Sequence, residues 1–428
     1  MGWEAFLFVA LGGLIFLLFL GVPVFVGFLT LNILGTLWLI GPRGFGMFVN
    51  SIGDTATSQV FATVALFVLM GELLFRSGTV DVLFDSIDRL VGRLKGRLYV
   101  VAIALSTVFG ALSGSAVAVA AMLGRSLTPK MESRGYDRKL SASTILAGAS
   151  LAPIIPPSLL AILVGSMADV SIAKLLIAGV VPGIMIAAIT LAYVLLRMPP
   201  MPNAAEPDRS TSVGMAGLRM MPFLMVIFSV MGMIMLGIAT PSESAATGVL
   251  GALIVAAVFG RLNMKMIGDS LMSAVGITAT LLIIVCSAKL FSQLLSFAGT
   301  TRGLVEFVSN LPFGPDVTFL VLMLIPFFLC MFVDQVAFML LAIPLYQPVV
   351  SAMGYDPVWF WTLFLINLTV GSITPPFGYT LFALKGANQA LDTRTIYAAA
   401  WPVVGLFIVS MVIMWAAPAL VTWLPSLF

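Results

Sequence analysis

Residues 100–124 read VVAIALSTVFGALSGSAVAVAAMLG, an apolar stretch of the length that usually crosses a lipid bilayer. Basic residues stand on both sides of it: Lys95 and Arg97 come just before, and Arg125 and Lys130 come just after. Because Lys and Arg gather in the cytoplasmic loops of membrane proteins, a helix that crosses once should carry them mainly at one end. We therefore predict that this segment enters the membrane, turns near its middle and leaves on the side from which it entered.

The composition indicates an all-α polytopic membrane protein. Of the 428 residues, 61% are hydrophobic and 9% are charged, and the mean hydropathy is +1.14. No histidine occurs, and Cys286 and Cys330 lie within apolar runs, so a transition-metal site, a disulfide and a histidine general base are not expected. The sequence also contains no Walker-type phosphate-binding string and no pairing of a nucleophile with a base. We expect no enzyme activity, no cofactor and no nucleic-acid partner.

The other apolar runs predict about ten transmembrane helices and a second re-entrant hairpin. Runs of spanning length fall near residues 3–21, 24–41, 59–75, 140–164, 171–196, 220–239, 243–260, 270–297, 358–384 and 395–420. With 98–124 and 317–345 both taken as hairpins, 17 of the 21 Lys and Arg residues fall in cytoplasmic loops. If 98–124 crossed the membrane instead, the basic residues of 76–97 would lie opposite those of 125–139, against the usual distribution. The same topology predicts that both chain termini are periplasmic.

The chain repeats itself at an offset of 219 residues. SRGYD at 133–137 corresponds to AMGYD at 352–356, and IIPPS at 154–158 corresponds to ITPPF at 373–377. An odd number of crossings in each half would invert the second half relative to the first, as in many secondary transporters. The predicted parts are a first inverted repeat at 1–200, a cytoplasmic linker at 201–218 and a second inverted repeat at 219–428.

Each predicted repeat contains one hairpin and one broken helix. These are hairpin 98–124 with broken helix 140–164, and hairpin 317–345 with broken helix 358–384. A helix of 25 residues is about 37 Å long, so folding it in two gives limbs of about 12 residues whose tip lies near the middle of a roughly 30 Å hydrocarbon core. Asp334 and Gln335 stand where the offset places Ser115 and Ala116. A carboxylate at that depth is a candidate site residue, and the alternative is a structural Asp bonded to amides at a helix start.

Consecutive prolines interrupt both broken helices, in ASLAPIIPPSLL (149–160) and VGSITPPFGYTL (370–381). Prolines remove amide donors and leave carbonyl groups free. Carbonyl and hydroxyl oxygens suit sodium, and the N-termini of half-helices favour an anionic substrate. A kink needed only for packing is the alternative interpretation.

The stretch VDVLFDSIDRLVGRLKGRL (80–98) has the spacing of an amphipathic helix. This spacing places Leu90 and Leu94 on the apolar face and Asp88 and Arg89 on the polar face. We expect the helix to lie along the cytoplasmic surface of the membrane.

Several of these motifs, taken in order, resemble one transporter family. They are LFVLMGELLFRSG (66–78), GALSGSAVA (110–118), MESRGYDRKLSAS (131–143), LAPIIPPS (151–158) and GSITPPFG (371–378). The chain resembles, over nearly its whole length, the large membrane subunit (DctM- or SiaM-like) of tripartite ATP-independent periplasmic (TRAP) transporters. The resemblance implies a sodium-coupled importer of small organic acids, of sialic acid or C4-dicarboxylate type, in the bacterial inner membrane. It also implies an elevator mechanism, in which a transport domain carrying the hairpins moves against a scaffold.

The resemblance further implies partners and site residues. The partners would be a small membrane subunit (DctQ- or SiaQ-like) on a separate chain and a periplasmic substrate-binding protein (DctP- or SiaP-like). Sodium, the only metal expected, would bind at Ser113, Gly114, Ser115, Ala152, Pro156 and Ser158 in the first half and at Asp334, Ser372, Thr374 and Gly378 in the second. Substrate would lie between the tips, at Ser115, Ser158, Asp334, Gln335 and Pro376. A stand-alone sodium/dicarboxylate symporter of the same superfamily, needing no binding protein, is the nearest alternative, and an ion channel is a weaker one.

Overall fold

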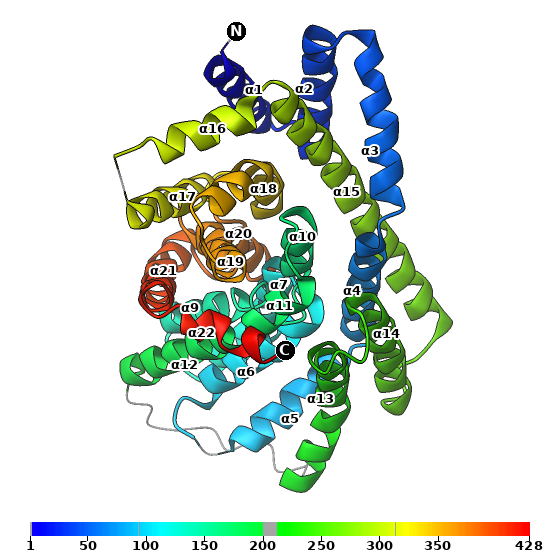
Figure 1. Cartoon of the computed structure of the whole chain (residues 1–428). Helices are drawn as coiled ribbons and strands as arrows, with labels where there is room; N and C mark the ends of the chain where they lie inside the picture. Colours follow the sequence, from blue (N-terminus) through cyan, green and yellow to red (C-terminus); the bar gives the residue numbers. More distant parts are fainter. Residues whose placement is uncertain (1, 93, 200–211, 313) are drawn as a thin grey trace.

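The computed structural model describes residues 2–92, 94–199, 212–312 and 314–428, and in these ranges all regular elements are helices. One set of helices forms an outer band that curves around the rest of the molecule (Figure 1). The outer band consists of α1 (Trp3–Phe19), α2 (Val24–Leu39), η1 (Pro42–Phe45), α3 (Gly46–Ala56), α4 (Gln59–Arg76), α5 (Val80–Val91), α13 (Val213–Met235), α14 (Pro241–Val258), α15 (Met264–Phe297) and α16 (Thr300–Ser309). Within it, α4 packs against α14 and α15, and α13 packs against α14.

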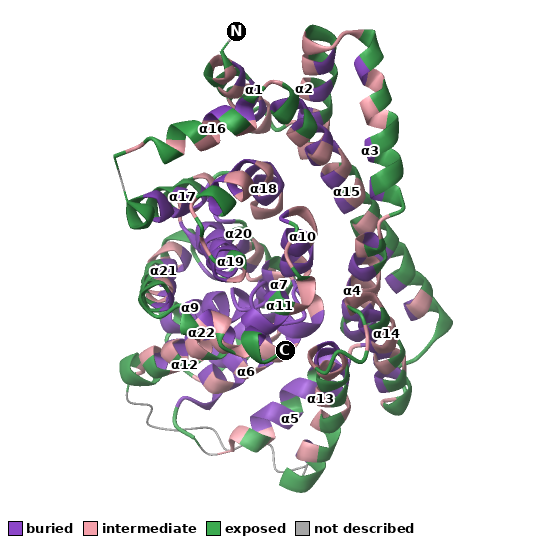
Figure 2. Ribbon diagram, viewed as in Figure 1, coloured by how far each residue is buried: buried purple, intermediate pink, exposed green. Residues whose placement is uncertain are grey.

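The remaining helices form an inner group. Its members are α6 (Arg97–Ser113), α7 (Ala116–Ser126), α8 (Thr128–Ser133), α9 (Arg138–Ala149), α10 (Leu159–Met167), α11 (Ile172–Ala178), α12 (Val180–Arg197), α17 (Pro315–Leu329), α18 (Gln335–Ala352), α19 (Pro357–Ile373), α20 (Tyr379–Ala387), α21 (Thr393–Ala416), α22 (Ala419–Thr422) and η2 (Leu424–Leu427). Figure 2 shows that buried residues concentrate in this group. Every residue of α19 from Trp359 to Ile373 is buried. The core of the protein therefore lies around the second broken helix.

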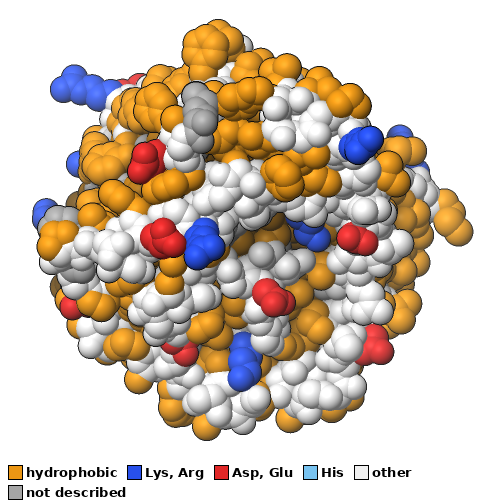
Figure 3. Space-filling view, turned by 45° about the horizontal axis from the view of Figure 1, so that its top comes forward, with side chains coloured by type: hydrophobic (Ala, Val, Ile, Leu, Met, Phe, Trp, Pro, Cys, Tyr) orange, Lys and Arg blue, Asp and Glu red, His pale blue; other side chains and the backbone are white. Residues whose placement is uncertain are grey.

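The exposed surface is that of a protein in a lipid environment. Large apolar side chains are exposed on many helices, for example Phe8 on α1, Leu196 on α12 and Met272 on α15. Apolar side chains cover much of the face in Figure 3, and charged side chains are scattered among them. Water would disfavour so much exposed apolar surface on a monomeric soluble protein, whereas hydrocarbon does not.

The helix lengths refine the predicted spans. Seven described helices are long and apolar enough to cross a membrane, and five shorter apolar helices include α1 and α2, with 17 and 16 residues. The predicted spans 140–164 and 358–384 are each divided into two helices, which removes both from the seven. By length α18 is one of the seven, although it is a limb of the second predicted hairpin. A simple count of long helices therefore differs from the ten predicted spans.

The hairpins turn where the sequence predicts, but their limbs are unequal. The first hairpin is α6 and α7, with 17 and 11 residues, and the second is α17 and α18, with 15 and 18. The prediction of limbs of about 12 residues, made for the first hairpin, was therefore confirmed for α7 and wrong for α6. Gly114, with a φ of 62°, makes the first turn, a conformation that glycine adopts without the strain other residues meet.

The repeated GYD motif has the same structural role in each half. Gly135 and Gly354 take positive φ values after helices α8 and α18. Asp137 and Asp356 then cap α9 and α19, each accepting a hydrogen bond from the amide three residues on, at 2.7 and 2.8 Å. The tyrosine between them binds the start of the preceding hairpin: the hydroxyl of Tyr136 accepts from the Leu98 amide at 3.2 Å, and that of Tyr355 donates to the Pro315 carbonyl.

The amphipathic segment is shorter than predicted. Helix α5 ends at Val91, with Gly92 at a positive φ, so Leu94 does not lie on its apolar face. Leu90 is 40% exposed. Asp88 is buried rather than on a polar face, because its carboxylate lies 2.7 Å from the Arg97 guanidinium at the start of α6.

Residues 201–211 of the predicted linker lie outside the described residues. Residues 213–218, also assigned to the linker, form the first turns of α13. The helix begins there because the hydroxyl of Ser212 caps it, accepting from the Met215 amide at 3.2 Å.

Candidate functional site

The two hairpin tips and the two helix breaks are the candidate site. The first tip is Ser113–Ser115 and the first break is Ser150–Ser158. The second tip is Cys330–Asp334 and the second break is Thr374–Gly378. All four segments interrupt helices, so backbone groups that would pair within a helix become available to a ligand.

The first tip lies directly on the first break. A methyl group added at Gly110 would stand 2.8 Å from the Cα atom of Ala152, so glycine is needed for this close approach. Gly114 approaches the Leu159 amide, where α10 begins. The structure thus places Gly114 of the predicted first tip against the residue that follows Ser158, and places Ala152 against Gly110, three residues before Ser113.

The second tip lies on the second break in the equivalent way. A methyl group at Gly371 would stand 2.4 Å from the Cβ atom of Cys330. The rings of Phe332 and Phe377 are 5.6 Å apart. Gly371 and Ala152 are related by the offset of 219, so a small residue at one position in each half admits the neighbouring hairpin.

Hydrogen bonds occupy most of the predicted hydroxyl groups. Ser115 caps α7 by accepting from the Ala118 amide at 3.3 Å. Ser158 accepts from the Ala161 amide at 3.2 Å and donates to the Pro153 carbonyl at 2.5 Å. Ser372 and Thr374 donate to carbonyls of α19, at 2.8 and 2.7 Å. These hydroxyls hold the breaks in shape, and their lone pairs rather than their protons are available to a cation.

The sequence left two interpretations of Asp334 open, a site residue or a structural Asp at a helix start. Asp334 caps α18, with Oδ1 accepting from the amides of Val336 and Ala337 at 3.0 and 3.1 Å. It is therefore the structural Asp of a helix start, yet its charge sits at the tip of an apolar hairpin. The neighbouring Gln335 has its Oε1 atom buried, with no hydrogen-bond partner among the described residues. A buried acceptor without a donor is unfavourable, and a cation would satisfy it.

The donor set suits a hard cation. Carboxylate, amide, hydroxyl and carbonyl oxygens occur at the tips and breaks, and such oxygens favour hard ions over transition metals. The first tip and break supply hydroxyl and carbonyl oxygens, and the second also supplies the Asp334 carboxylate. Pro376 is exposed at the second break, and its carbonyl accepts from the Tyr397 hydroxyl at 2.5 Å.

Helices from the two halves also pack against each other. The second limb of the first hairpin, α7, packs along α20, which follows the second break. Gly124 of α7 faces Leu384 and Ala387 of α20. This brings the two halves of the inner group into one body around the site.

The outer band contributes contacts that the sequence did not point to. Gly71 of α4 touches the first tip: a methyl group there would stand 2.7 Å from the Leu112 carbonyl oxygen. Phe19, at the end of α1, lies 6.3 Å from the ring of Phe332 in the second tip. Gly71 lies inside a quoted motif, LFVLMGELLFRSG, but nothing in the sequence relates it to residue 112.

Comparison with known proteins places this architecture in a family. The family model described as "Tripartite ATP-independent periplasmic transporter, DctM component" matches residues 11–420. The ectoine TRAP transporter large permease protein TeaC of Halomonas elongata is 32% identical over 373 residues, 86% of each chain. The sialic acid TRAP transporter large permease protein SiaM of Vibrio cholerae is 29% identical over 96% of each chain.

A solved structure shares the fold. It is that of the Alcanivorax borkumensis YdaH transporter, with a TM-score of 0.64 over 90% of both chains and 14% sequence identity. The fold, the paired tips and breaks and the family match over most of the sequence lead to one conclusion. The chain belongs to the DctM-component family of TRAP transporters, as the large permease subunit of a secondary transporter.

Proposed function

We propose that this chain is the sodium-coupled translocation subunit of a binding-protein-dependent importer in the bacterial inner membrane. Its substrate class would be small organic solutes that carry a carboxylate. The relatives TeaC and SiaM are named for ectoine and sialic acid, both of which contain this group. A small membrane subunit and a periplasmic binding protein, which complete TRAP systems, would be its partners, and both chain termini would be periplasmic.

We assign two sodium sites, each made of a tip and the break that it touches. The observation that carries this proposal is the second tip, where Asp334 is followed directly by Gln335, whose buried Oε1 atom has no hydrogen-bond partner within the described part of the chain. A sodium ion there would balance the carboxylate charge and satisfy the amide oxygen. The first site would use the oxygens of Ser113–Ser115, Ala152, Pro156 and Ser158. Substrate would bind between the tips, near Ser115 and Asp334.

Transport would follow an elevator mechanism, with the inner group as transport domain and the outer band as scaffold. The division of the molecule into an inner group and an outer band supports this mechanism, because both tips and both breaks belong to the inner group. The offset of 219 relates α6–α7 to α17–α18 and α9–α10 to α19–α20, in keeping with two inverted repeats. Contacts such as that of Gly71 with the first tip would then break during movement.

The test is uptake by proteoliposomes that contain this chain with its small subunit and binding protein. Asp334→Asn removes the charge while keeping a side chain that caps helices as well as Asp does. We expect it to abolish sodium-driven uptake and to leave thermal stability nearly unchanged. Asp356→Asn is the matched control, because Asp356 caps the next helix, α19, through the same kind of bond.

Two results would contradict the proposal. Sodium-dependent uptake by Asp334→Asn at the level of Asp356→Asn would show that Asp334 acts only as a helix cap. Uptake of free substrate in the absence of any binding protein would instead identify a stand-alone symporter.

A further inference from the structure

Three aromatic side chains are exposed beside the second tip and the second break. Phe332 belongs to the tip, two residues before Asp334, Phe377 belongs to the break, and Tyr379 is the first residue of α20. Their exposed fractions are 43%, 52% and 46%, and the ring centroids of Phe332 and Phe377 are 5.6 Å apart. Tyr379 is close enough to the Asp334 carboxylate for the two groups to interact electrostatically. We call these three residues the aromatic wall.

The first half has no counterpart of the aromatic wall. The offset of 219 pairs its members with two serines and a leucine, namely Phe332 with Ser113, Phe377 with Ser158 and Tyr379 with Leu160. Ser158 and Leu160 are buried, whereas their partners are about half exposed. The first half folds into an equivalent tip and break without these rings, so the shared architecture does not account for them.

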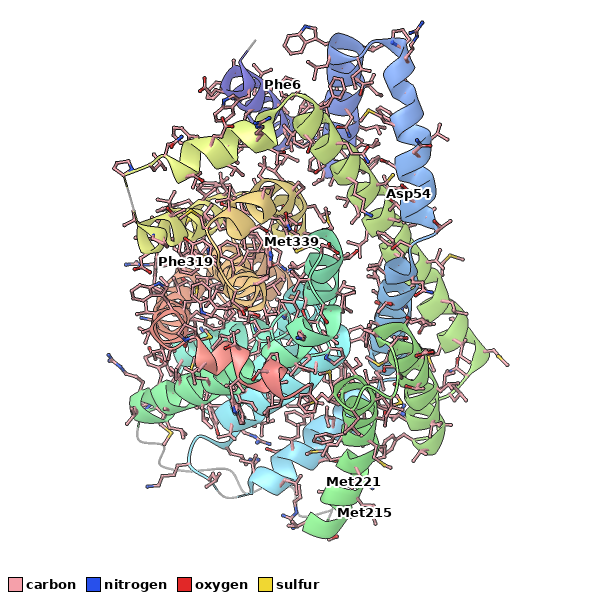
Figure 4. All side chains as sticks on the ribbon, in the orientation of Figure 1. Phe6, Asp54, Met215, Met221, Phe319 and Met339 are labelled. Carbon is pink, nitrogen blue, oxygen red and sulfur yellow. The ribbon has the colours of Figure 1, made fainter. Side chains whose placement is uncertain are left out.

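The aromatic wall lies at the boundary between the inner group and the outer band. The ring of Phe332 is 6.3 Å from that of Phe19, at the end of α1. The first tip reaches the same boundary, where Gly71 of α4 meets it. Figure 4 labels Phe6 on α1 and Met339 on α18, which mark the two sides of this boundary. Both tips therefore face the outer band.

The start of α20 lies beside the start of α7. Gly124, eight residues after Ala116 at the start of α7, faces Ala387, eight residues after Tyr379 at the start of α20. Helices of 11 and 9 residues can pack along their length in this register only if they run in the same direction. Ser115, which caps α7, is therefore level with Tyr379, on an adjacent helix whose axis is about 8–10 Å away. The space between the tips has hydroxyl groups on one side and aromatic rings on the other.

We infer that Phe332, Phe377 and Tyr379 contact the part of the substrate that carries no carboxylate, and that they select monocarboxylates with an apolar, unhydroxylated body. The inference rests on the proposed function, because it takes the space beside Asp334 as the substrate site. Aromatic rings give apolar groups favourable contacts that need no hydrogen bond. A sugar hydroxyl or a second carboxylate held against them loses water and gains no partner. The aromatic wall therefore disfavours sugar acids and dicarboxylates.

The experiment measures the binding of three probes to the detergent-purified full chain at saturating sodium. Phenylacetate has an apolar ring, succinate has a second carboxylate, and gluconate has several hydroxyl groups. Dissociation constants follow from the rise in unfolding temperature with probe concentration. We expect phenylacetate to bind about ten-fold more tightly than succinate or gluconate. In saturation-transfer NMR, its ring protons should receive more saturation from the protein than its methylene protons.

Two substitutions replace a ring with the side chain found at the equivalent position of the first half. Phe332→Ser and Phe377→Ser should each weaken phenylacetate binding about three- to ten-fold, the effect of one aromatic contact, and should leave succinate binding unchanged. Phe377→Leu keeps an apolar side chain and should recover part of the loss. Phe8→Ser is the matched control, because Phe8 is an exposed phenylalanine of α1, and it should leave phenylacetate binding unchanged.

Several outcomes would overturn the inference. They are phenylacetate binding that does not saturate, tighter binding of succinate or gluconate, and equal phenylacetate binding by Phe377→Ser, Phe332→Ser and Phe8→Ser. Equal weakening of all three probes would also do so, because it would indicate a structural role. If Phe377→Ser does not fold, Phe332→Ser and Phe377→Leu decide the question. Phenylacetate binding that depends on Phe377 but not on sodium would support the aromatic wall and contradict the sodium coupling of the proposed function.

Discussion

Gly71 gives a direct test of whether the first hairpin moves against the outer band. In this conformation a methyl group at Gly71 would lie 2.7 Å from the Leu112 carbonyl oxygen and 3.2 Å from the Cα atom of Ser113. Both neighbours are backbone atoms, so no side-chain rotation relieves the overlap. Overpacking of this kind costs about 1–3 kcal/mol. An alanine in place of a helical glycine otherwise gains about 1 kcal/mol.

Gly71→Ala should therefore act on one conformation selectively. If the tip leaves α4 during transport, the cost applies only while the two are in contact, and the ratio of the two conformations shifts by about 5- to 150-fold. Gly232→Ala is the matched control, because Gly232 is a helical glycine of the outer band with no atom within 4 Å of an added methyl group. It should stabilise the protein slightly and leave the ratio unchanged.

The assay is single-molecule energy transfer between dyes on Val258→Cys of α14 and Leu196→Cys of α12, both of which are exposed. The two native cysteines are replaced by alanine in this background. Gly71→Ala should deplete the population whose distance matches this structure and should slow sodium-driven uptake. A distance distribution and an uptake rate equal to those of Gly232→Ala would refute the packing argument and with it this part of the elevator proposal.

Three further predictions concern the contacts that hold the inner group in shape. Asp137→Ala and Asp356→Ala should each lower the free energy of unfolding by about 1 kcal/mol, through loss of a helix cap, while the Asn variants should not; thermal unfolding in detergent measures this. Asp88→Asn should destabilise the protein by about 3–5 kcal/mol because it leaves the Arg97 guanidinium buried without its partner, and Asp88→Leu combined with Arg97→Met should recover most of the loss, with no recovery arguing against a simple ion pair. Tyr136→Phe should cost about 1 kcal/mol by removing the acceptor of the Leu98 amide, and an unchanged unfolding temperature would mean that water replaces it.

Much of the fold follows from local sequence. Hydrocarbon allows only helices whose backbone groups are satisfied, so apolar runs predict helices, and their lengths with the positions of Lys and Arg predict which runs turn back. The turn at Gly114 and the cap at Asp334 follow in the same way, since both depend on residues within a few positions of the turn.

The predictions that were wrong failed for physical reasons. Hairpin limbs differ in length because the turn position depends on which residues can end a helix, not on the midpoint of an apolar run. The predicted polar face of α5 included Asp88, but amphipathic spacing does not identify a buried charge whose partner, Arg97, belongs to the next helix.

What the sequence by itself determined is the order of helices, hairpins and breaks, because backbone hydrogen bonding and hydrophobic length act over short distances along the chain. Only the tertiary structure decided which tip touches which break, that Gly71 meets Leu112, and that Phe19 of α1 lies beside Phe332 of the second tip. Such contacts join residues tens to hundreds of positions apart, and they depend on close packing of particular shapes rather than on residue type alone.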